Sequence, residues 1–437
     1  MLDTLIPKMA ARNCLRMWRY SLWALVTLAT GLNSLLLFRG FVLGANALYT
    51  ETYRQRVMLG DVLIEANDRL MTSGWKAMLD EDVQEKVDAL LDQHATKIED
   101  RLKALEVDGE ISLGQKSGAF IGLAQERQAG ERFRGERWNW NTLAGSPLAQ
   151  EGDLVLGRYL AILLGCEPSS AAYLNPIRKG PAYFRSVRQF SCPESQDGRV
   201  MLAVATEHGQ RNLSMMTLRG LIDAGFQDID RMWGNLDLKD AQTLLDTKRV
   251  SWISVLLKPG VSSTEFASAL GPELQLLNLK ATPWDEHRLT DLYQRTRDFL
   301  TLLDIFMTLI LCGIICLSIF NLNLKIIDER TREIGLLQSL GFSKRSLSLM
   351  FLSESSLTSF AGIGLGLILA VTCMVVLNSL GITYRAGLLT DPVPLFIDWN
   401  PSLWIKSVAL LSGLALASTS AATTLALRRS VVECLVH

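Results

Sequence analysis

The sequence is poor in charged residues and in cysteine, and each shortage excludes a class of protein. Only 20% of its 437 residues are charged, and 44 Lys and Arg against 45 Asp and Glu leave a formal charge of −1. A nucleic-acid-binding protein needs clustered positive charge, so that class is excluded. Seven cysteines are too few for a disulfide scaffold, and a hydrophobic content of 49% excludes a disordered chain. The mean hydropathy of +0.19 indicates that part of the chain is not soluble.

Motifs for catalysis and cofactor binding are absent as well. The chain has no G-x-x-x-x-G-K-[ST] loop to cradle a nucleotide phosphate, no H-E-x-x-H or C-x-x-C pair for zinc, and no G-x-S-x-G nucleophile elbow. By itself it cannot be the ATPase of a pump. We expect no catalytic site, no cofactor and no metal site in this chain.

Four long runs without charged residues are the most informative feature of the sequence. They cover residues 21–38, 305–324, 355–384 and 407–427. A helix needs roughly 20 apolar residues to cross about 30 Å of hydrocarbon, where its backbone polar groups can be satisfied only internally. We therefore predict four transmembrane helices, at residues 21–43, 299–324, 354–384 and 403–427.

The first run has a second interpretation as a cleavable signal peptide. Basic residues such as Arg16 precede it, and an A-x-A pattern follows at Ala45 and Ala47. The run exceeds the usual apolar region of such peptides, and Arg39 lies before the candidate cleavage site, which favours a membrane helix. For the other runs the alternative is a buried core helix, which their length disfavours.

The short flanks of these runs predict the orientation in the membrane, because basic residues are retained in the cytoplasm. Basic residues precede the first run, fill the segment between the second and third, and follow the fourth, as Arg19, Arg330 and Arg428 illustrate. The expected cytoplasmic parts are an amphipathic N-terminal helix at residues 1–20, a segment at 325–353 and a tail at 428–437, so that both termini are cytoplasmic. The expected periplasmic parts are residues 44–298 and a loop at 385–402.

Residues 44–298 contain enough chain for a domain with its own core. Apolar residues at helical spacing predict a helix over residues 80–106, and short apolar or β-branched stretches predict strands. These strands lie at residues 60–65, 153–156, 200–204 and 250–257. The predicted fold class is therefore membrane α-helical, with four transmembrane helices and a large mixed α/β domain inserted between the first and second.

Cys166 and Cys192 are the only cysteines in this predicted outer domain, and they lie in a proline-rich stretch without a regular pattern. An oxidising compartment would allow them to form a disulfide. A closed loop of about 25 residues would stabilise the fold by roughly 3 kcal/mol in the chain-entropy account. Two free thiols remain the alternative.

Three glycines, Gly362, Gly364 and Gly366, lie within the third run, where a close-packing surface is the expected role. Gly362 and Gly366 have the G-x-x-x-G spacing that lets two membrane helices approach closely. The partner helix belongs either to this chain or to a second one, and we favour packing within the chain.

The segment between the second and third runs has the pattern of a short amphipathic helix. Leu336, Leu337 and Leu340 form a stripe at helical spacing, Gly341 stands where a helix would end, and Ser343 can cap the next helix. Such a helix either lies on the lipid surface or binds a protein. Its acidic residues would be repelled by anionic head groups, which favours a protein partner.

This segment resembles the signature of the FtsX-like ABC permeases, a family that includes the macrolide exporter MacB, the lipoprotein-release permeases LolC and LolE, and the division regulator FtsX. The signature is E-R-x-x-E-I-G-L-L-x-x-L-G, followed by a leucine-rich helix that ends in Glu. The matching residues are Glu329, Arg330, Glu333, Ile334, Gly335, Leu336, Leu337, Leu340, Gly341 and Glu354.

The predicted outer domain is more loosely similar to the periplasmic core domain of the same family. The similar stretches are residues 153–165, 218–230 and 238–245. Two features depart from the family: residues 168–196 have no counterpart, and Val431 and Val432 stand where a proline is usual.

The resemblance implies a permease subunit of the bacterial inner membrane. It would pair with a second permease, identical or paralogous, and with two copies of an ABC ATPase, which would bind ATP and Mg²⁺. The helix at residues 330–341 would be the coupling helix, with Arg330 and Glu333 at the rim of the ATPase interface and the three leucines in its groove. A periplasmic adaptor or lipoprotein and membrane lipid are the other partners that the resemblance implies.

Three functions remain open at this point. The chain extracts or expels a hydrophobic cargo such as a lipoprotein, a lipid or an amphipathic compound, or it transmits ATP hydrolysis to a periplasmic enzyme or partner without moving a substrate. The third is a structural protein on a degenerate permease scaffold. The intact coupling signature argues against this third function.

Overall fold

The structure is a computed structural model that describes residue 16 and residues 18–67, 78–138, 142–168, 190–193, 197–222, 224, 226–384 and 393–427. Most of the predicted N-terminal helix at 1–20, part of the loop at 385–402 and the tail at 428–437 lie outside these residues. The chain divides into two units. A membrane unit holds residues 1–46, 297–382 and 395–437, and an α/β unit holds residues 47–296 and 383–394.

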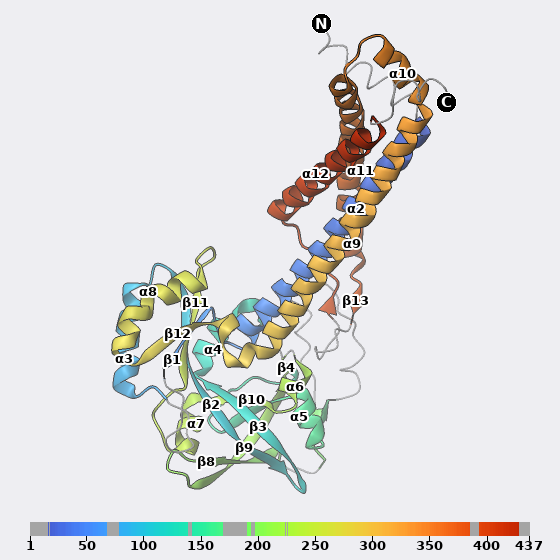
Figure 1. Cartoon of the computed structure of the whole chain (residues 1–437). Helices are drawn as coiled ribbons and strands as arrows, with labels where there is room; N and C mark the ends of the chain where they lie inside the picture. The colour runs from blue at the N-terminus through green and yellow to red at the C-terminus, as the bar shows by residue number, and fades with distance from the viewer. Residues whose placement is uncertain are drawn as a thin grey trace. The chain divides into compact units, whose positions relative to one another are not determined.

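Within the described residues, four helices are long and apolar enough to cross a membrane (Figure 1). They are α2 (Trp18–Glu51), α9 (Asp291–Glu329), α11 (Lys344–Leu380) and α12 (Pro401–Ala426). The prediction of four membrane helices with a mixed α/β domain between the first and second is confirmed. The helices α2, α9 and α11 contain 34, 39 and 37 residues, whereas about 20 residues span the hydrocarbon. These three helices therefore continue beyond the apolar runs.

Leucine and isoleucine side chains hold the membrane unit together. On α2, Leu28, Leu32, Leu35 and Leu36 are three, four, seven and eight residues apart, so they share one face of the helix, and all four are almost fully buried. They form one cluster with residues of the other three helices, among them Ile315, Ile319, Ile363, Leu411 and Ala415. The face of α2 that these leucines form is thus covered by the other helices of the same chain.

Close packing of α11 on α2 explains two of the three glycines. A Cβ atom on Gly366 would lie 3.0 Å from the carbonyl oxygen and 3.1 Å from the Cα of Ala29, and one on Gly362 would lie 3.0 Å from the Cβ of Leu28. Gly364 has open space where its Cβ would stand, so it takes no part in this contact. The G-x-x-x-G pair therefore packs within the chain, and the expectation that Gly364 shares the surface is wrong.

We expect Gly366→Leu to force α11 away from α2, because the new side chain would meet backbone atoms that cannot rotate aside. Overpacking of this kind costs about 1–3 kcal/mol. The thermal unfolding midpoint of the full chain in detergent should fall. Gly364→Leu is the matched control: it adds the same side chain to the same helix in open space, and it should leave the midpoint unchanged or raise it. Equal losses for the two variants would contradict the packing.

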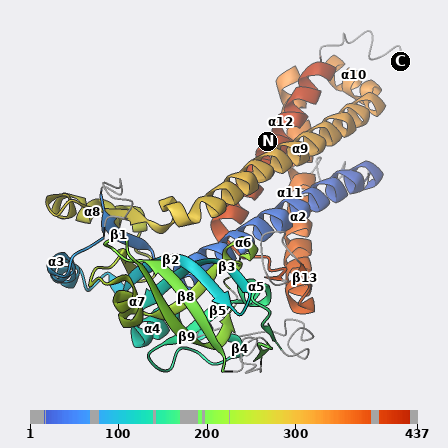
Figure 2. The same cartoon turned by 90° about the horizontal axis from the view of Figure 1, so that it is seen from below.

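The α/β unit is built on one ten-stranded sheet. Its strands are β1 (Val62–Ala66), β2 (Ile98–Leu113), β3 (Lys116–Gln125), β4 (Thr142–Gly145), β5 (Asp153–Gly157), β8 (Arg199–Ala205), β9 (Arg211–Ile222), β10 (Trp233–Asp237), β11 (Trp252–Leu257) and β12 (Leu279–Pro283). The order is β12-β1-β11-β2-β3-β10-β5-β9-β4, and β8 pairs with both β2 and β9. The ladders from β2 through β3, β10, β5, β9 and β8 back to β2 therefore form a closed ring, which leaves few free edges (Figures 1 and 2).

Within the described residues, six α-helices accompany the sheet. They are α3 (Glu81–Gln93), α4 (Arg127–Trp138), α5 (Arg158–Leu163), α6 (Gln227–Asp230), α7 (Leu238–Leu245) and α8 (Ser263–Leu276). The four predicted strands are present as β1, β5, β8 and β11. The helix predicted over residues 80–106 is wrong beyond Gln93, because β2 begins at Ile98. In β2 the buried Leu102 and Ala104 alternate with the charged Arg101 and Lys103, which pair with Asp88 of α3. This period of two is typical of a strand.

A disulfide joins Cys166 and Cys192 across 26 residues of chain. It lies next to the two-residue ladder of β6 (Glu167–Pro168) with β7 (Phe190–Ser191), and Cys166 belongs to the buried core of the α/β unit. Closure of a loop of this length stabilises a fold by about 3 kcal/mol in the chain-entropy account. Residues 169–189 and 194–196 of this proline-rich stretch lie outside the described residues.

The ends of two membrane helices contribute side chains to one aromatic cluster in the α/β unit. The end of α2 and the π-helical turn η1 (Thr52–Arg56) contribute Tyr49 and Tyr53, and the start of α9 contributes Tyr293. The ring centroids of Tyr53 and Phe226 are 4.8 Å apart, those of Trp284 and Tyr293 are 4.8 Å apart, and those of Tyr53 and Tyr293 are 5.7 Å apart. Since both helices end in one cluster, their ends are held together.

Candidate coupling segment

The chain turns twice between α9 and α11, and a short helix, α10 (Thr331–Ser339), lies between the turns (Figure 1). The helix α9 continues to Glu329, so residues 325–329 belong to the same helix as the second span. Gly341 has a φ of +93°, in the left-handed region that favours glycine, and it follows the end of α10. The Ser343 Oγ accepts a 3.2 Å hydrogen bond from the Ser346 N–H and caps α11. Both turns use the residues that the sequence predicted for them.

Arg330 is buried and contacts both α10 and α11. Its Nη1 lies 2.8 Å from Oε2 of Glu354 on α11, and its Nε lies 3.2 Å from Oε2 of Glu333 on α10. The guanidinium carbon lies 5.3 Å from the ring centroid of Phe351. Only 8% of Arg330 is exposed. The expectation that Arg330 lies at the rim of an interface is therefore wrong: it is a buried contact between α10 and α11.

The start of α2 contacts the same corner. The hydroxyl of Tyr20 donates a hydrogen bond to Oε1 of Glu329, and Nζ of Lys325 lies 5.5 Å from the centroid of the Tyr20 ring. Arg16 Nη1 lies 2.9 Å from Oε1 of Glu333, although both side chains are largely exposed, so this pair contributes little to stability. The first membrane helix is thus connected to the segment that joins the second and third.

The inner face of α10 packs on a small apolar cluster of the membrane unit. Ile334 and Gly335 are buried, and Leu337 is half-buried against the same cluster. The other members of this cluster are Ile327, Leu347, Met350, Phe351 and Leu427. Leu337 therefore faces its own chain, which differs from the expectation that all three leucines of α10 face a partner.

The outer face of α10 is apolar and uncovered by this chain. Leu336 is 57% exposed and Leu340 is 70% exposed, and Phe342 in the following turn is also exposed. The neighbouring Lys344 and Arg345 are exposed as well. Large apolar side chains that stand together outside the membrane-spanning runs, with charged residues beside them, are typical of a protein interface.

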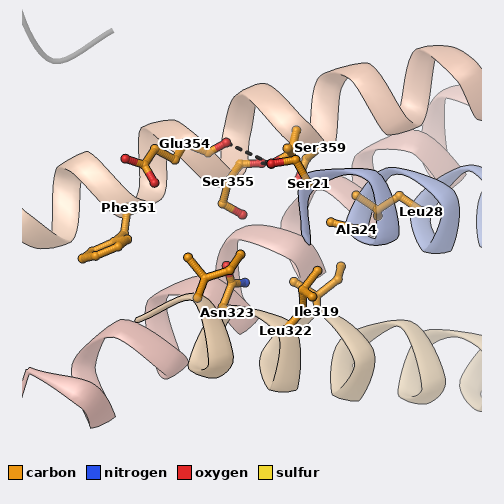
Figure 3. A pocket seen from close by; sticks show the side chains of 12 residues that line it. Ser21, Ala24, Leu28, Ile319, Leu322, Asn323, Phe351, Glu354, Ser355 and Ser359 are labelled. Carbon is orange, nitrogen blue, oxygen red and sulfur yellow. Dashed lines mark hydrogen bonds between the residues drawn. The ribbon is translucent and has the colours of Figure 1, made fainter. Parts of the chain in front are cut away.

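A small cavity with a mixed polar and apolar lining lies between α2, α9 and α11, and Glu354 forms part of its wall (Figure 3). Its volume is about 40 Å³, and its polar lining comes from Ser21, Asn323, Glu354, Ser355 and Ser359, among others. Such a volume accommodates about three water molecules. The helices are therefore less tightly packed here than along the leucine-lined part of the bundle, which leaves room for them to shift.

Sequence reasoning found α10, its caps and its exposed leucines, but not the contacts that hold α10 in place. Glu354 was recognised as part of the signature, yet its partner Arg330 is 24 residues away, and Tyr20 is 309 residues from Glu329. Among the described residues, no group of three or more His, Cys, Asp or Glu side chains could hold a metal ion. The described residues therefore make α10 a helix that is anchored on one face and carries exposed apolar side chains on the other.

Comparisons with known proteins agree with the signature. Residues 305–431 match the family described as FtsX-like permease, C-terminal. The chain is similar to the lipoprotein-releasing system transmembrane protein LolC of Xylella fastidiosa, with 23% identity over 219 residues that make up 48% of this chain and 51% of that protein. The chain thus spans about half the length of the curated relative it matches.

Two solved structures resemble the chain at low identity. The periplasmic region of MacB from Actinobacillus actinomycetemcomitans shares 13% identity, covers 52% of this chain and 89% of its own, and has a TM-score of 0.32. The extracellular domain of the ABC-type transporter YknZ from Gram-positive bacteria shares 11% identity, covers 50% of this chain and 92% of its own, and has a TM-score of 0.29.

The family that the signature at residues 329–341 predicted is confirmed for the C-terminal part of the chain. Residues 305–431, which include α10, α11 and α12, form an FtsX-like permease C-terminal domain.

Proposed function

We propose that this chain is the membrane subunit of an ABC transporter of the FtsX-like type, and that α10 docks on a separate ATPase. The observation that carries this proposal is the outward-facing pair Leu336 and Leu340, on a helix that Arg330 anchors from the buried side. The partner would bind ATP and Mg²⁺. Two copies of it would serve two permeases, this chain and an identical or paralogous one.

The contacts of α10 suggest how a movement of the ATPase would reach the rest of the chain. Arg330 would pass a displacement of α10 to α11 through Glu354, and the Tyr20–Glu329 hydrogen bond would link the adjoining end of α9 to α2. Because α2 and α9 end in one aromatic cluster, a displacement of either helix would act on the α/β unit as a whole. Mechanical transmission of this kind needs packed elements that move as bodies.

The cargo that we propose is hydrophobic: a lipoprotein, a lipid or an amphipathic compound. The name of the relative LolC, a lipoprotein-releasing protein, favours the first of these. A second candidate function is the transmission of ATP hydrolysis to a partner of the α/β unit without transport. The connection of two membrane helices to one aromatic cluster in that unit would serve either function.

The experiment that separates these functions is reconstitution of the full chain in nanodiscs with the ABC ATPase that co-purifies with it. Transport predicts ATP-dependent release of a fluorescent acylated lipoprotein from the disc. Transmission predicts ATP hydrolysis without release, and stimulation by a soluble partner. If no ATPase co-purifies with the chain, both proposals fail.

We also propose that the chain lies in the inner membrane with both termini in the cytoplasm and the α/β unit outside, as the basic flanks predicted. Ser117 is exposed at the start of β3 and suits a labelling site. In a variant whose other cysteines are replaced, Ser117→Cys should react with an impermeant maleimide in intact spheroplasts. The cysteine variant Arg345→Cys should react only after lysis. The reverse pattern would contradict the proposed orientation.

A further inference from the structure

Two opposite charges face each other at one edge of the apolar runs. Arg39 on α2 directly follows the run at residues 21–38, and Asp304 on α9 directly precedes the run at residues 305–324. The Nε of Arg39 lies 3.3 Å from Oδ1 of Asp304, and the two side chains are 19% and 25% exposed. Because these runs span the hydrocarbon, the pair lies at the level of the lipid head groups on one side of the membrane.

The pair contacts a third helix and lies at one end of a row of polar side chains between the helices. The Nη1 of Arg39 donates a 3.3 Å hydrogen bond to Oγ of Ser407, which is fully buried on α12. One or two turns further into the bundle, the buried Oδ1 of Asn33 and Oγ1 of Thr308 have no hydrogen-bond partner within the part of the chain that the structure describes. Buried polar atoms without partners are rare, and they point to a bound polar group or to a contact that changes.

The level of Arg39 and Asp304 is also marked by tryptophan. Trp399, just before α12, and Trp404, in its first turn, have ring centroids 4.3 Å apart, and Trp399 is 50% exposed. Tryptophan gathers at the membrane–water interface because its ring is apolar and its N–H is polar. The molecules that surround the Arg39–Asp304 pair at this depth are therefore lipid head groups.

An ion pair between two membrane helices can separate only if both charges find new partners. Both side chains are largely buried between the helices, so an unpaired guanidinium and an unpaired carboxylate would each be costly there. An anionic head group would pair with Arg39 in place of Asp304, but it would leave the Asp304 carboxylate unpaired. A neutral head group would pair with neither side chain. A zwitterionic head offers a phosphate to Arg39 and an ammonium to Asp304.

We propose that Arg39 and Asp304 form a recognition site for the zwitterionic head of an amphiphilic lipid, an inference that rests on the proposed function. Entry of this head group separates α2 from α9. The pair closes on itself in the absence of such a lipid. A ligand shifts a conformational equilibrium only by its differential affinity for the two states, and the zwitterion supplies that difference here.

The separation of α2 and α9 can be followed by a disulfide about two to three turns along the helices from the pair. A Cβ on Gly31 of α2 would lie 2.4 Å from Cδ1 of Ile315 on α9, so cysteines at these two positions face each other between the helices. In the full chain in maltoside micelles, with the other free cysteines replaced, Gly31→Cys with Ile315→Cys should form a disulfide on mild oxidation. Lyso-phosphatidylethanolamine should slow this reaction by about fivefold or more, the lower end of the usual range of coupling between sites.

The controls test the chemistry of the head group and the role of the pair. Lyso-phosphatidylglycerol and a neutral monoacylglycerol should slow the reaction much less. Addition of Arg39→Leu and Asp304→Leu together removes both charges without leaving one unpaired, and it should abolish the difference between the lipids. Equal effects of all three lipids, or an unchanged preference in the doubly substituted variant, would overturn the proposal. No ATPase is needed, so a failure here is distinct from a failure of the proposed function.

Discussion

Replacement of Leu336 and Leu340 by Asp should abolish co-purification of the ATPase with this chain. Both leucines are more than half exposed on the outer face of α10, so they are free to fill a groove on a partner. A carboxylate buried in such a groove without a counter-charge costs several kcal/mol. We therefore expect a loss of affinity of at least about 1,000-fold, the factor that 4 kcal/mol gives. The measurement is the amount of ATPase retained on the affinity-tagged full chain in detergent.

The matched control for this experiment is Leu276→Asp. Leu276 is 87% exposed at the end of α8 in the α/β unit, so the same substitution removes an exposed leucine far along the chain from α10. It should leave ATPase binding unchanged. The thermal midpoint should stay within a few degrees of wild type for both variants, since neither side chain is buried within the chain. ATPase retained at full stoichiometry by Leu336→Asp/Leu340→Asp would restore the alternative of a helix that lies on lipid.

Leu337 illustrates how far the sequence could predict the docking face. A stripe at helical spacing identifies the apolar side of a helix, but α10 has two apolar faces, since Ile334 and Leu337 pack on its own chain while Leu336 and Leu340 point outward. Which leucine faces inward depends on how α10 is oriented against α11, and that follows from the Arg330–Glu354 contact. A Leu337→Asp change would therefore disturb the chain itself as well as any interface.

The membrane helices and the α/β unit were predictable to different degrees. Long apolar runs are a strong signal, because the hydrocarbon imposes a minimum length, and all four helices were found. The strand β2 was mistaken for a continuation of α3, because charged side chains on one face of a strand and charged side chains on a helix look alike over a few residues. The closed ring of ladders through β8 could not be predicted, since it depends on pairs that are distant in sequence.

The polar contacts of the membrane unit were the least predictable part. In the sequence Arg39 is only a charged residue after the first run, and nothing in its local pattern points to Asp304, which lies more than 260 residues further along the chain. The same holds for Tyr20 and Glu329. A charge at the end of an apolar run is nevertheless a usable signal, because a charged residue at that depth needs a partner.

Arg330→Leu should destabilise the junction between α10 and α11 by about 3–5 kcal/mol, because Glu354 loses its buried ion pair with Arg330. Glu354 is only 9% exposed and lines the cavity between α2, α9 and α11. The double variant Arg330→Leu/Glu354→Leu removes both charges and should recover most of this loss, since an ion pair replaced by apolar side chains is often neutral or stabilising. The measurement is the unfolding midpoint of the full chain in detergent, combined in a double-mutant cycle.

Arg332→Leu is the matched control for this prediction, because Arg332 lies on the same helix and is exposed. Its effect should stay within about 0.5 kcal/mol, as is usual for surface substitutions. The cycle also separates anchoring from docking. The double variant keeps Leu336 and Leu340 in place and should still bind the ATPase, whereas Arg330→Leu alone should bind it less well because α10 is no longer held. Equal effects of Arg330→Leu and Arg332→Leu would mean that the buried pair does not hold α10, and that the leucine face is positioned by the apolar cluster beneath it.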